Sequence, residues 1–407
     1  MTVVSISRLS AGGDGVGRLP DGMVVFVPRT APGDSAEIEV VDRRKRHAHG
    51  RLLRLERPGP ARVEPECPHY AADRCGGCQL QHLSLPAQRD AKGAIVGDAL
   101  RRIGRRETPD PEVIAAPAPW RYRTKITLAV SGERMGLHRY DAPGMVFTLD
   151  DCRIAREPLM RLWSALRNHL GLLPAALEEL VLREDRAGGL HLVAAGGAEP
   201  WDAAPLAAAA GVAGVAYWWR PRGGAARIVA GARTGFPALA FEQVNPELAV
   251  RIRQDALQDL GDVGGKIVWD LYGGVGDAAR LLAAGGARVF SVDRDRSAIE
   301  WARGWAGAGT DITWFEGLVE ETLHRLPEPD AVLVNPPRAG LVARVSAALQ
   351  AWGESRPGAR LCYVSCDPAT LARDLTRLPA FALAKVRAYD LFPQTSHVET
   401  LAVLQAA

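Results

Sequence analysis

The sequence predicts an α/β protein with a C-terminal sheet domain, an N-terminal small β-barrel and a mixed α+β central domain, and three patterns support this prediction. From residue 236 onward, buried-type strands alternate with helical segments, which is typical of a parallel sheet covered on both faces. Residues 1–57 consist of short alternating strands separated by Gly- and Pro-rich turns, as in small barrels. Residues 120–235 mix helix and strand patterns. A chain of 407 residues accommodates two to four domains.

Residues 58–119 connect the predicted barrel to the central domain. They are rich in loop-forming residues and contain three of the six cysteines. Within them, residues 86–104 carry apolar side chains near helical spacing and end on a glycine, which predicts a helix there. In the C-terminal domain, residues 236–407, the predicted strands are KIVWDLY, RVFSVD, DAVLVN and ARLCYVS, and the predicted helices are ARLLAAGG, SAIEWARGWA and PATLARDLTRL.

Composition and charge narrow the function classes. No run of 18 or more apolar residues occurs, and the N-terminus lacks the pattern of a secretion signal, so we expect a cytoplasmic protein. In that compartment, cysteines serve metal binding or catalysis more often than disulfides. Residues 1–125 hold 21 Lys and Arg against 15 Asp and Glu, although the net charge of the chain is only +3. This local excess of positive charge suits the binding of a polyanion, and a solvated arginine-rich surface would also explain it.

A glycine-rich loop, Asp270-Leu-Tyr-Gly-Gly-Val-Gly276, follows a predicted strand and opens a predicted helix. Glycines let the backbone approach a ligand closely. Asp293 ends the next strand, where an acid can accept hydrogen bonds from ribose hydroxyls. Nicotinamide-dependent enzymes use similar loops, but an acid before the glycines resembles class I S-adenosylmethionine methyltransferases. The next strand runs into Asn335-Pro-Pro-Arg-Ala-Gly340, a rigid loop at the sheet edge where such folds bind ligands.

Cys366 is a candidate nucleophile, because it lies at a strand end beside a predicted helix start, where the helix can favour a thiolate. Its position alone suits a buried structural thiol equally well. Cys362 lies inside the same strand and is interpreted as a packing residue. A thiolate that adds to carbon 6 of uracil makes carbon 5 nucleophilic toward a sulfonium methyl. A base must then remove the carbon 5 proton. Glu399 is the candidate base and His397 is the alternative.

Together these segments resemble the iron–sulfur-type RNA 5-methyluridine methyltransferases. GGDGVGRLPDGMVVFVPRTAPGD looks like the OB-like TRAM barrel, and YVSCDPATLARDL and DLFPQTSHVETLAVL look like the nucleophile and base motifs. The resemblance implies a Rossmann-like class I methyltransferase sheet, an RNA partner (ribosomal RNA preferred, transfer RNA possible), a monomer, Cys366 as nucleophile and Glu399 as base. It also implies S-adenosylmethionine contacts from Gln243, Tyr272, Asp277, Asp293 and Asn335.

Four further cysteines form a candidate metal site. Cys67, Cys75 and Cys78 share the connecting segment, and Cys152 completes a set of four. Their spacing alone suits zinc or an iron–sulfur cluster. The resemblance implies a [4Fe-4S] cluster with a structural role.

The chain also departs from the family pattern. Asn335 replaces the usual Asp, Gly317 stands where some members have Asn, and Gly273 stands where Cys is common. A catalytically silent RNA-binding protein of the same fold is therefore one alternative. An RNA 5-methylcytosine methyltransferase is another, although those enzymes carry a cysteine in the loop that reads Asn-Pro-Pro-Arg here.

Overall fold

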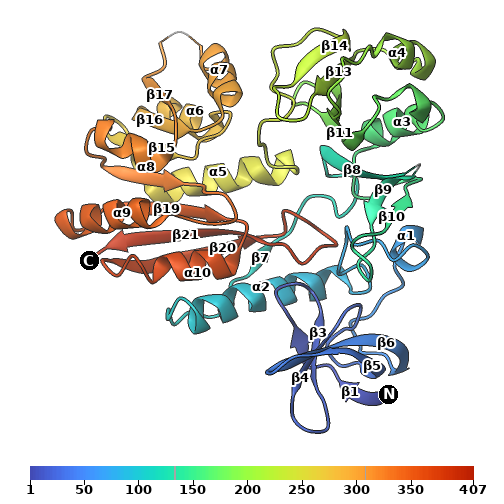
Figure 1. The fold of residues 1–407 in the computed structure, drawn as a ribbon. Coiled ribbons are helices and arrows are strands. Elements are labelled where there is room, and N and C mark those ends of the chain that lie inside the picture. The colour runs from blue at the N-terminus through green and yellow to red at the C-terminus, as the bar shows by residue number, and fades with distance from the viewer. Residues whose placement is uncertain (133, 308) are drawn as a thin grey trace.

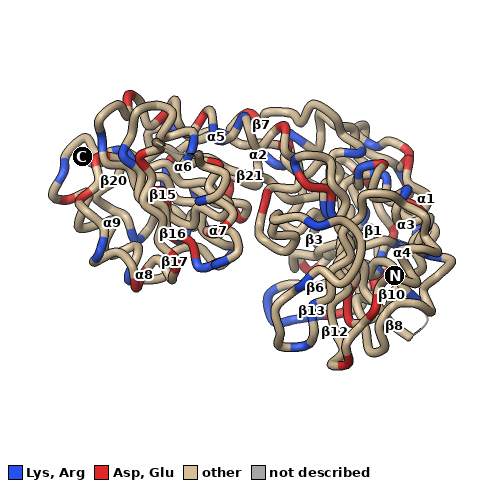
Figure 2. Tube along the Cα trace, turned by 90° about the horizontal axis from the view of Figure 1, so that it is seen from above, with Lys and Arg blue, Asp and Glu red and all other residues tan. Residues whose placement is uncertain are grey.

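The computed structural model describes residues 1–132, 134–307 and 309–407. Three sheets follow one another along the chain, as Figure 1 shows. They match the predicted fold class, which is confirmed. Figure 2 shows acidic and basic residues interspersed over both halves of the molecule, so the N-terminal excess of positive charge is not gathered into one block.

The N-terminal sheet has six strands in the order β1-β5-β6-β4-β3-β2. Alternating burial along the strands places Val25, Val27, Ile38 and other apolar side chains in one core. The β5–β6 turn carries consecutive exposed basic residues, Arg43 to Arg46. The strands are β1 Thr2–Ser5, β2 Arg8–Leu9, β3 Gly15–Arg18, β4 Val24–Val27, β5 Ser35–Arg43 and β6 His47–Arg57.

The connecting segment contains α1 (Pro68–Ala71), α2 (Leu85–Arg102) and β7 (Val113–Ile114). Helix α2 agrees with the predicted helix to within two residues at its end. Strand β7 pairs with the strand of residues 381–389 through Val113 and Ala388 and so forms one edge of the C-terminal sheet. The connecting segment is thus joined to a sheet that lies far away in the sequence.

The central sheet has seven strands in the order β10-β9-β8-β11-β12-β13-β14. Large aromatic side chains, Trp163, Tyr217 and Trp219, are fully buried in its core with the helices α3 and α4. The elements are β8 Lys125–Ser131, β9 Arg134–His138, β10 Val146–Thr148, α3 Glu157–Leu166, η1 Leu170–Leu172, β11 Leu177–Glu184, β12 Leu190–Gly196, α4 Ala204–Ala210, β13 Val215–Arg220 and β14 Arg227–Gly231.

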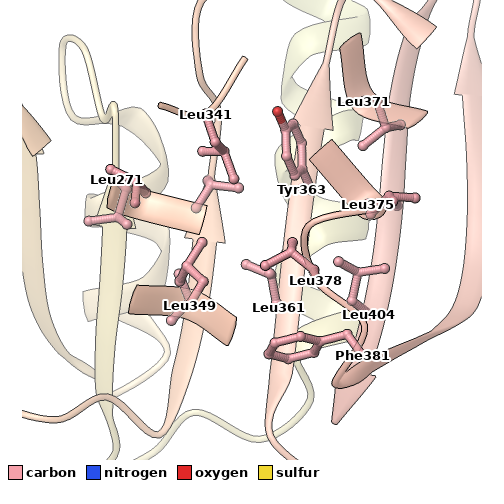
Figure 3. Packing of buried hydrophobic residues seen from close by; sticks show 14 of the residues in the cluster. Leu271, Leu341, Leu349, Leu361, Tyr363, Leu371, Leu375, Leu378, Phe381 and Leu404 are labelled. Atoms are coloured by element: carbon pink, nitrogen blue, oxygen red, sulfur yellow. The ribbon is translucent and has the colours of Figure 1, made fainter. Parts of the chain in front are cut away.

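The C-terminal sheet has eight strands in the order β17-β16-β15-β18-β19-β21-β20-β7. Figure 3 shows part of its core, where Leu371 and Leu375 of α10 lie near Tyr363 and Leu361 of β19. The elements are α5 Pro246–Leu260, β15 Ile267–Leu271, α6 Asp277–Ala284, β16 Arg288–Asp293, α7 Arg296–Trp305, β17 Ile312–Glu316, α8 Val319–Thr322, η2 Leu323–Arg325, β18 Ala331–Val334, α9 Ala343–Ser355, β19 Arg360–Ser365, α10 Pro368–Leu375, β20 Phe381–Tyr389 and β21 Glu399–Ala406.

Strand direction in this sheet determines which loops meet. Strands β15, β18 and β19 are parallel neighbours, so the loops that follow them lie at one edge. Strand β21 runs antiparallel to β19 and pairs Thr400 with Ser365. Its first residue therefore lies at the same edge as the loops.

None of the helices within the described ranges combines the length and the apolar character that crossing a membrane requires.

Candidate active site

A pocket at this edge of the C-terminal sheet contains most of the residues expected to bind the cofactor. Gln243, Tyr272, Asp277 and Asn335 all line it, together with Gly273 and Gly274 of the glycine-rich loop. Tyr272 adopts a backbone φ of 63°, in the left-handed region, so the loop turns sharply at its start. Four of the five predicted cofactor residues thus share one pocket.

The fifth, Asp293, lies behind the loop and is not among the residues that line this pocket in the described part of the chain. Its Oδ2 accepts a hydrogen bond of 2.8 Å from the Gly274 amide, and its Oδ1 accepts one of 2.8 Å from the Asp295 amide. Asp293 therefore supports the loop that forms the pocket.

Packing explains one departure from the family pattern. A Cβ atom at Gly273 would collide with Ser291 Oγ and with a carboxylate oxygen of Asp270. Asp270 is fully buried, accepts a hydrogen bond of 2.9 Å from Ser291 Oγ, and has its pKa raised to about 7 by burial. The backbone at Gly273 thus lies directly against this pair, and no side chain fits there.

The rim of the pocket is linked to the central domain by ion pairs. Asp277, the first residue of α6, lies 2.8 Å from Arg186 Nη1 and 3.4 Å from Arg253 Nη1. Arg186 follows β11 and also pairs with Glu242. Since Glu242 is next to Gln243, the central domain contacts the cofactor pocket at two points.

Cys366 and Glu399 are brought to adjacent strand ends. Cys366 is the first residue after β19, and Glu399 is the first residue of β21. Their chain neighbours, Ser365 and Thr400, are paired across the two strands. Glu399 is 1% exposed, and its Oε1 accepts a hydrogen bond of 3.3 Å from Gln243 Nε2 of the cofactor pocket. Its Oε2 is buried and has no hydrogen-bond partner among the described residues. One carboxylate oxygen is thus held while the other is free to accept a proton.

Burial controls the pKa values of this pair. It raises the pKa of Glu399 to about 8, against the lowering effects of Gln243 and Arg338. It also raises the pKa of the Cys366 thiol, and the Glu399 carboxylate adds to that rise. Burial thus shifts the thiol pKa in the direction opposite to the one that the start of α10 favours. Cys362 is fully buried in β19, in agreement with its interpretation as a packing residue.

Arg338 is a residue whose part in the site the sequence did not reveal. Its positive charge and a hydrogen bond lower the pKa of Cys366, and its charge also lowers the pKa of Glu399. Asp374 of α10 anchors the loop that carries Arg338, since its Oδ2 accepts a hydrogen bond of 2.7 Å from the Leu341 amide. In the sequence, the signal for this role was the position of Arg338 directly after two prolines, in the rigid loop that follows β18.

A groove opens above the nucleophile between the N-terminal sheet and α10. Its lining includes Cys366, Asp367 and His397, Arg8 and Gly12 near the N-terminal sheet, and one face of α2 from Ala87 to Arg102. Burial, together with the charges of Arg338, Lys92 and Arg123, lowers the pKa of His397 to about 4. His397 is therefore a much weaker base than Glu399 at neutral pH, although both belong to one site.

The four predicted metal-binding cysteines gather in one region. Cys67, Cys78 and Cys152 pack in one apolar cluster with Tyr70 and Tyr122. Cys152 also packs against the neighbouring core cluster that contains Cys75. Burial raises the pKa of all four thiols, and neighbouring cysteines contribute to the rise at Cys75, Cys78 and Cys152. All four are free thiols.

The closeness of these four cysteines does not by itself give the geometry of metal ligands. Across residues 1–132, 134–307 and 309–407, no group of three or more His, Cys, Asp or Glu is arranged to hold a metal ion. Arg29 lies beside the thiols: its Nη2 donates a hydrogen bond of 2.5 Å to the Cys75 carbonyl, and its guanidinium is 3.2 Å from the centre of the Tyr70 ring. The predicted cluster therefore stays a prediction.

Comparisons with known families match both ends of the chain. Residues 3–53 match the TRAM domain, and residues 305–407 match the tRNA (Uracil-5-)-methyltransferase family. A solved structure, the Pyrococcus abyssi tRNA (uracil-54, C5)-methyltransferase in complex with S-adenosyl-L-homocysteine, has the same fold. It aligns with a TM-score of 0.75 and 24% identity over 99% of this chain and 100% of that one.

Relatives match over nearly the full length. An uncharacterized RNA methyltransferase of Thermosynechococcus vestitus is 33% identical, with 98% of this chain and 96% of that protein aligned. The 23S rRNA (uracil(1939)-C(5))-methyltransferase RlmD of Shewanella sediminis is 30% identical, with 99% of this chain and 95% of that protein aligned. The similarity therefore spans all three sheets.

Proposed function

The chain belongs to the RNA (uracil-5-)-methyltransferase family, and on that premise we propose that it methylates carbon 5 of a uridine in RNA, giving 5-methyluridine. The observation that carries the proposal is that Cys366 and Glu399 lie at adjacent strand ends beside the cofactor pocket. Glu399 is buried there, with one carboxylate oxygen hydrogen-bonded and the other without a partner among the described residues. We propose 23S ribosomal RNA as the substrate, because relatives that align over nearly the whole chain are named for it.

The reaction follows from the two side chains. The Cys366 thiolate adds to carbon 6 of the uracil, and the electron pair of the carbon 5–carbon 6 bond moves toward the carbonyl oxygen at carbon 4. S-adenosylmethionine, when bound, would supply the methyl as a sulfonium: carbon 5 would take the methyl as the sulfur–methyl bond breaks, and S-adenosylhomocysteine would be the leaving group. Glu399 Oε2 removes the carbon 5 proton, the double bond re-forms, and the thiolate leaves. Arg338 stabilises the thiolate before addition and after elimination.

The pocket suits S-adenosylmethionine. The glycine loop packs tightly against Asp270 and Ser291, Asp293 fixes it, and Asn335 and Tyr272 line the pocket in front of it. Gln243 lies between this pocket and Glu399, so it can contact the methyl donor and orient the base together. Calorimetry with S-adenosylmethionine tests the assignment, and we expect Asp293→Ala to weaken binding.

We further propose that Cys67, Cys75, Cys78 and Cys152 bind a [4Fe-4S] cluster. Four thiols in one buried region are the donor set of such a cluster. Its role would be to hold the connecting segment together, because methyl transfer by this route needs no electron. Iron and sulfide analysis of anaerobically purified protein tests this, and stoichiometric zinc in place of iron would contradict it.

The domains divide the work in this proposal. Residues 1–57 bind RNA, residues 58–119 carry three of the cluster ligands and α2, residues 120–235 contribute Cys152 and contact the rim of the cofactor pocket through Arg186, and residues 236–407 perform methyl transfer. We propose a monomer, which sedimentation of the purified protein can test. Mapping 5-methyluridine in total RNA from strains with and without this gene tests the function itself.

RNA affinity is expected to depend on salt through the basic β5–β6 turn. Replacing Arg44, Lys45 and Arg46 with alanine removes three exposed charges, so the slope of log affinity against log salt should shrink by roughly 2–3. Filter binding at several salt concentrations measures this. Arg344→Ala on α9 is the control. An unchanged slope in the triple variant would show that RNA binds at another surface of the protein.

The methylation rate is expected to rise with pH. Glu399 removes a proton only as a carboxylate, and its pKa is raised to about 8. The Cys366 pKa is raised as well, so both reactive forms increase toward alkaline pH. Single-turnover rates should therefore climb from pH 6 and should still be rising above pH 8, because the Cys366 thiol, whose pKa lies above its ordinary value, is then still mainly protonated. A rate that stays flat between pH 6 and pH 9 would contradict this assignment.

A further inference from the structure

The loop that leads to Glu399 is held from outside the catalytic sheet. Residues 390–398 join β20 to β21 and end directly before Glu399. Figure 1 shows this red loop extending from the C-terminal sheet toward α2 and the chain before it. Most of the hydrogen bonds described below connect the loop to residues 79–92, about three hundred residues earlier in the sequence.

The centre of the contact is a reciprocal amide pair between Gln88 of α2 and Gln394 of the loop. The Gln394 amide N–H donates to Gln88 Oε1 at 3.0 Å, and Gln88 Nε2 donates to Gln394 Oε1 at 2.9 Å. Both side chains are buried, at 1% and 4% exposure. Gln394 has a backbone φ of 70°, a left-handed conformation that persists at a non-glycine residue only when its surroundings fix it.

The chain just after the last clustered cysteine adds two more bonds to the same residue. The Gln394 carbonyl accepts hydrogen bonds of 3.1 Å from the Gln79 amide and 2.9 Å from the Leu80 amide. Gln79 Oε1 also accepts a bond of 3.3 Å from the Ser396 amide. Gln79 directly follows Cys78, so the middle and the end of the loop are attached to the cysteine segment.

The start of the loop is held by α2 as well. Lys92 is fully buried, pairs with Asp390, and donates a hydrogen bond of 3.0 Å from Nζ to the Phe392 carbonyl. Tyr122, which packs with the clustered cysteines, donates a bond of 3.0 Å to the Pro393 carbonyl. Residues at the start, in the middle and near the end of the loop are therefore held by the connecting segment or its immediate neighbours.

We propose that Gln88 is a positioning residue for proton removal, because its amide pair with Gln394 fixes the loop that places Glu399. The separate hydrogen bonds between Gln79 and this loop make the position of the base depend on the folded cysteine segment as well. This inference rests on the proposed function. It predicts a defect at one step, because Cys366 is carried by β19 and does not depend on this loop. Addition of the thiol and methyl transfer should continue, while proton removal and release of the RNA should slow.

The test uses Gln88→Met in the full-length protein, because methionine keeps the length of the side chain and removes both hydrogen bonds to Gln394. It also removes the bonds from Gln88 Nε2 to the Leu80 and Leu83 carbonyls, so the Gln394 variant below is needed beside it. The matched control is Gln254→Met, at an exposed glutamine of α5. Covalent RNA–protein complex is measured on denaturing gels, and 5-methyluridine release is measured with uridine RNA. Turnover by Gln88→Met should fall by roughly 10–100-fold while covalent methylated complex accumulates, since a small displacement of a catalytic group has effects of this size.

Two further variants separate positioning from general stability. Gln394→Gly accepts the left-handed backbone and removes only the side-chain half of the pair, so it should show the same step-specific defect with an unchanged unfolding midpoint. Because both changes break one pair, the double variant should be no worse than Gln88→Met alone. A loss of complex formation in parallel with turnover, or no loss of turnover, would overturn the inference. Absence of 5-methyluridine formation by the unaltered protein would instead refute the proposed function.

Discussion

Replacing Cys366 with alanine is expected to abolish 5-methyluridine formation, with a loss on the order of 10³-fold or more, because the carbon 5 position of uracil is not nucleophilic without the thiol adduct. S-adenosylmethionine and RNA should still bind, since Cys366 does not line the cofactor pocket described above. Single-turnover methylation and calorimetry measure the two properties separately.

Cys362→Ala provides the matched control for this variant. Cys362 is four residues earlier on β19 and fully buried, so its replacement should lower stability and leave the methylation mechanism intact. If Cys366→Ala still produces 5-methyluridine, a covalent mechanism through this residue is wrong. If both variants fail equally, the loss reflects folding, and the unfolding midpoints would show it.

Replacing Glu399 with glutamine is expected to slow turnover by roughly 10²–10⁴-fold, the usual effect of losing a general base. The amide keeps the contact with Gln243 and the shape of the buried site, but it cannot accept the carbon 5 proton. The methylated RNA should therefore remain attached to Cys366, and the variant should accumulate a covalent complex that carries the methyl group. Radiolabelled methyl on the protein band of a denaturing gel measures it.

Glu354→Gln, on the exposed face of α9, is the control for the loss of a carboxylate. It should turn over at the normal rate. A Glu399→Gln variant that releases product normally would show that another group, such as His397, removes the proton. The pKa of His397, lowered to about 4, argues against that outcome.

Much of the site could be predicted because of how the C-terminal strands end. The glycine loop, the Asn335 loop and Cys366 each follow a buried strand, and parallel strands place such loops at one edge. The alternating pattern of the sequence was therefore enough to bring these residues together. Glu399 needed the further fact that β21 is antiparallel and pairs beside β19, which no periodicity reveals.

Other features depend on contacts between distant segments. The raised pKa of Cys366 results from burial, whereas its sequence neighbours indicated the opposite shift. Arg338 influences both Cys366 and Glu399 from a loop that Asp374, 36 residues later in the sequence, helps to hold. The Gln88–Gln394 pair joins residues that are 306 positions apart, and a lone glutamine in a helix carries no local signal of such a role. The gathering of the four cysteines likewise requires the central domain to supply Cys152.

Covalent trapping on RNA with 5-fluorouridine at the target position tests the central claim most directly. Fluorine at carbon 5 cannot be removed as a cation, so the methylated adduct cannot break down once Cys366 has added. The account predicts a stable, methyl-labelled RNA–protein complex with the unaltered protein, and peptide mass spectrometry should locate the link at Cys366. A complex that forms equally well with Cys366→Ala, or methylated RNA without any covalent complex, would contradict it.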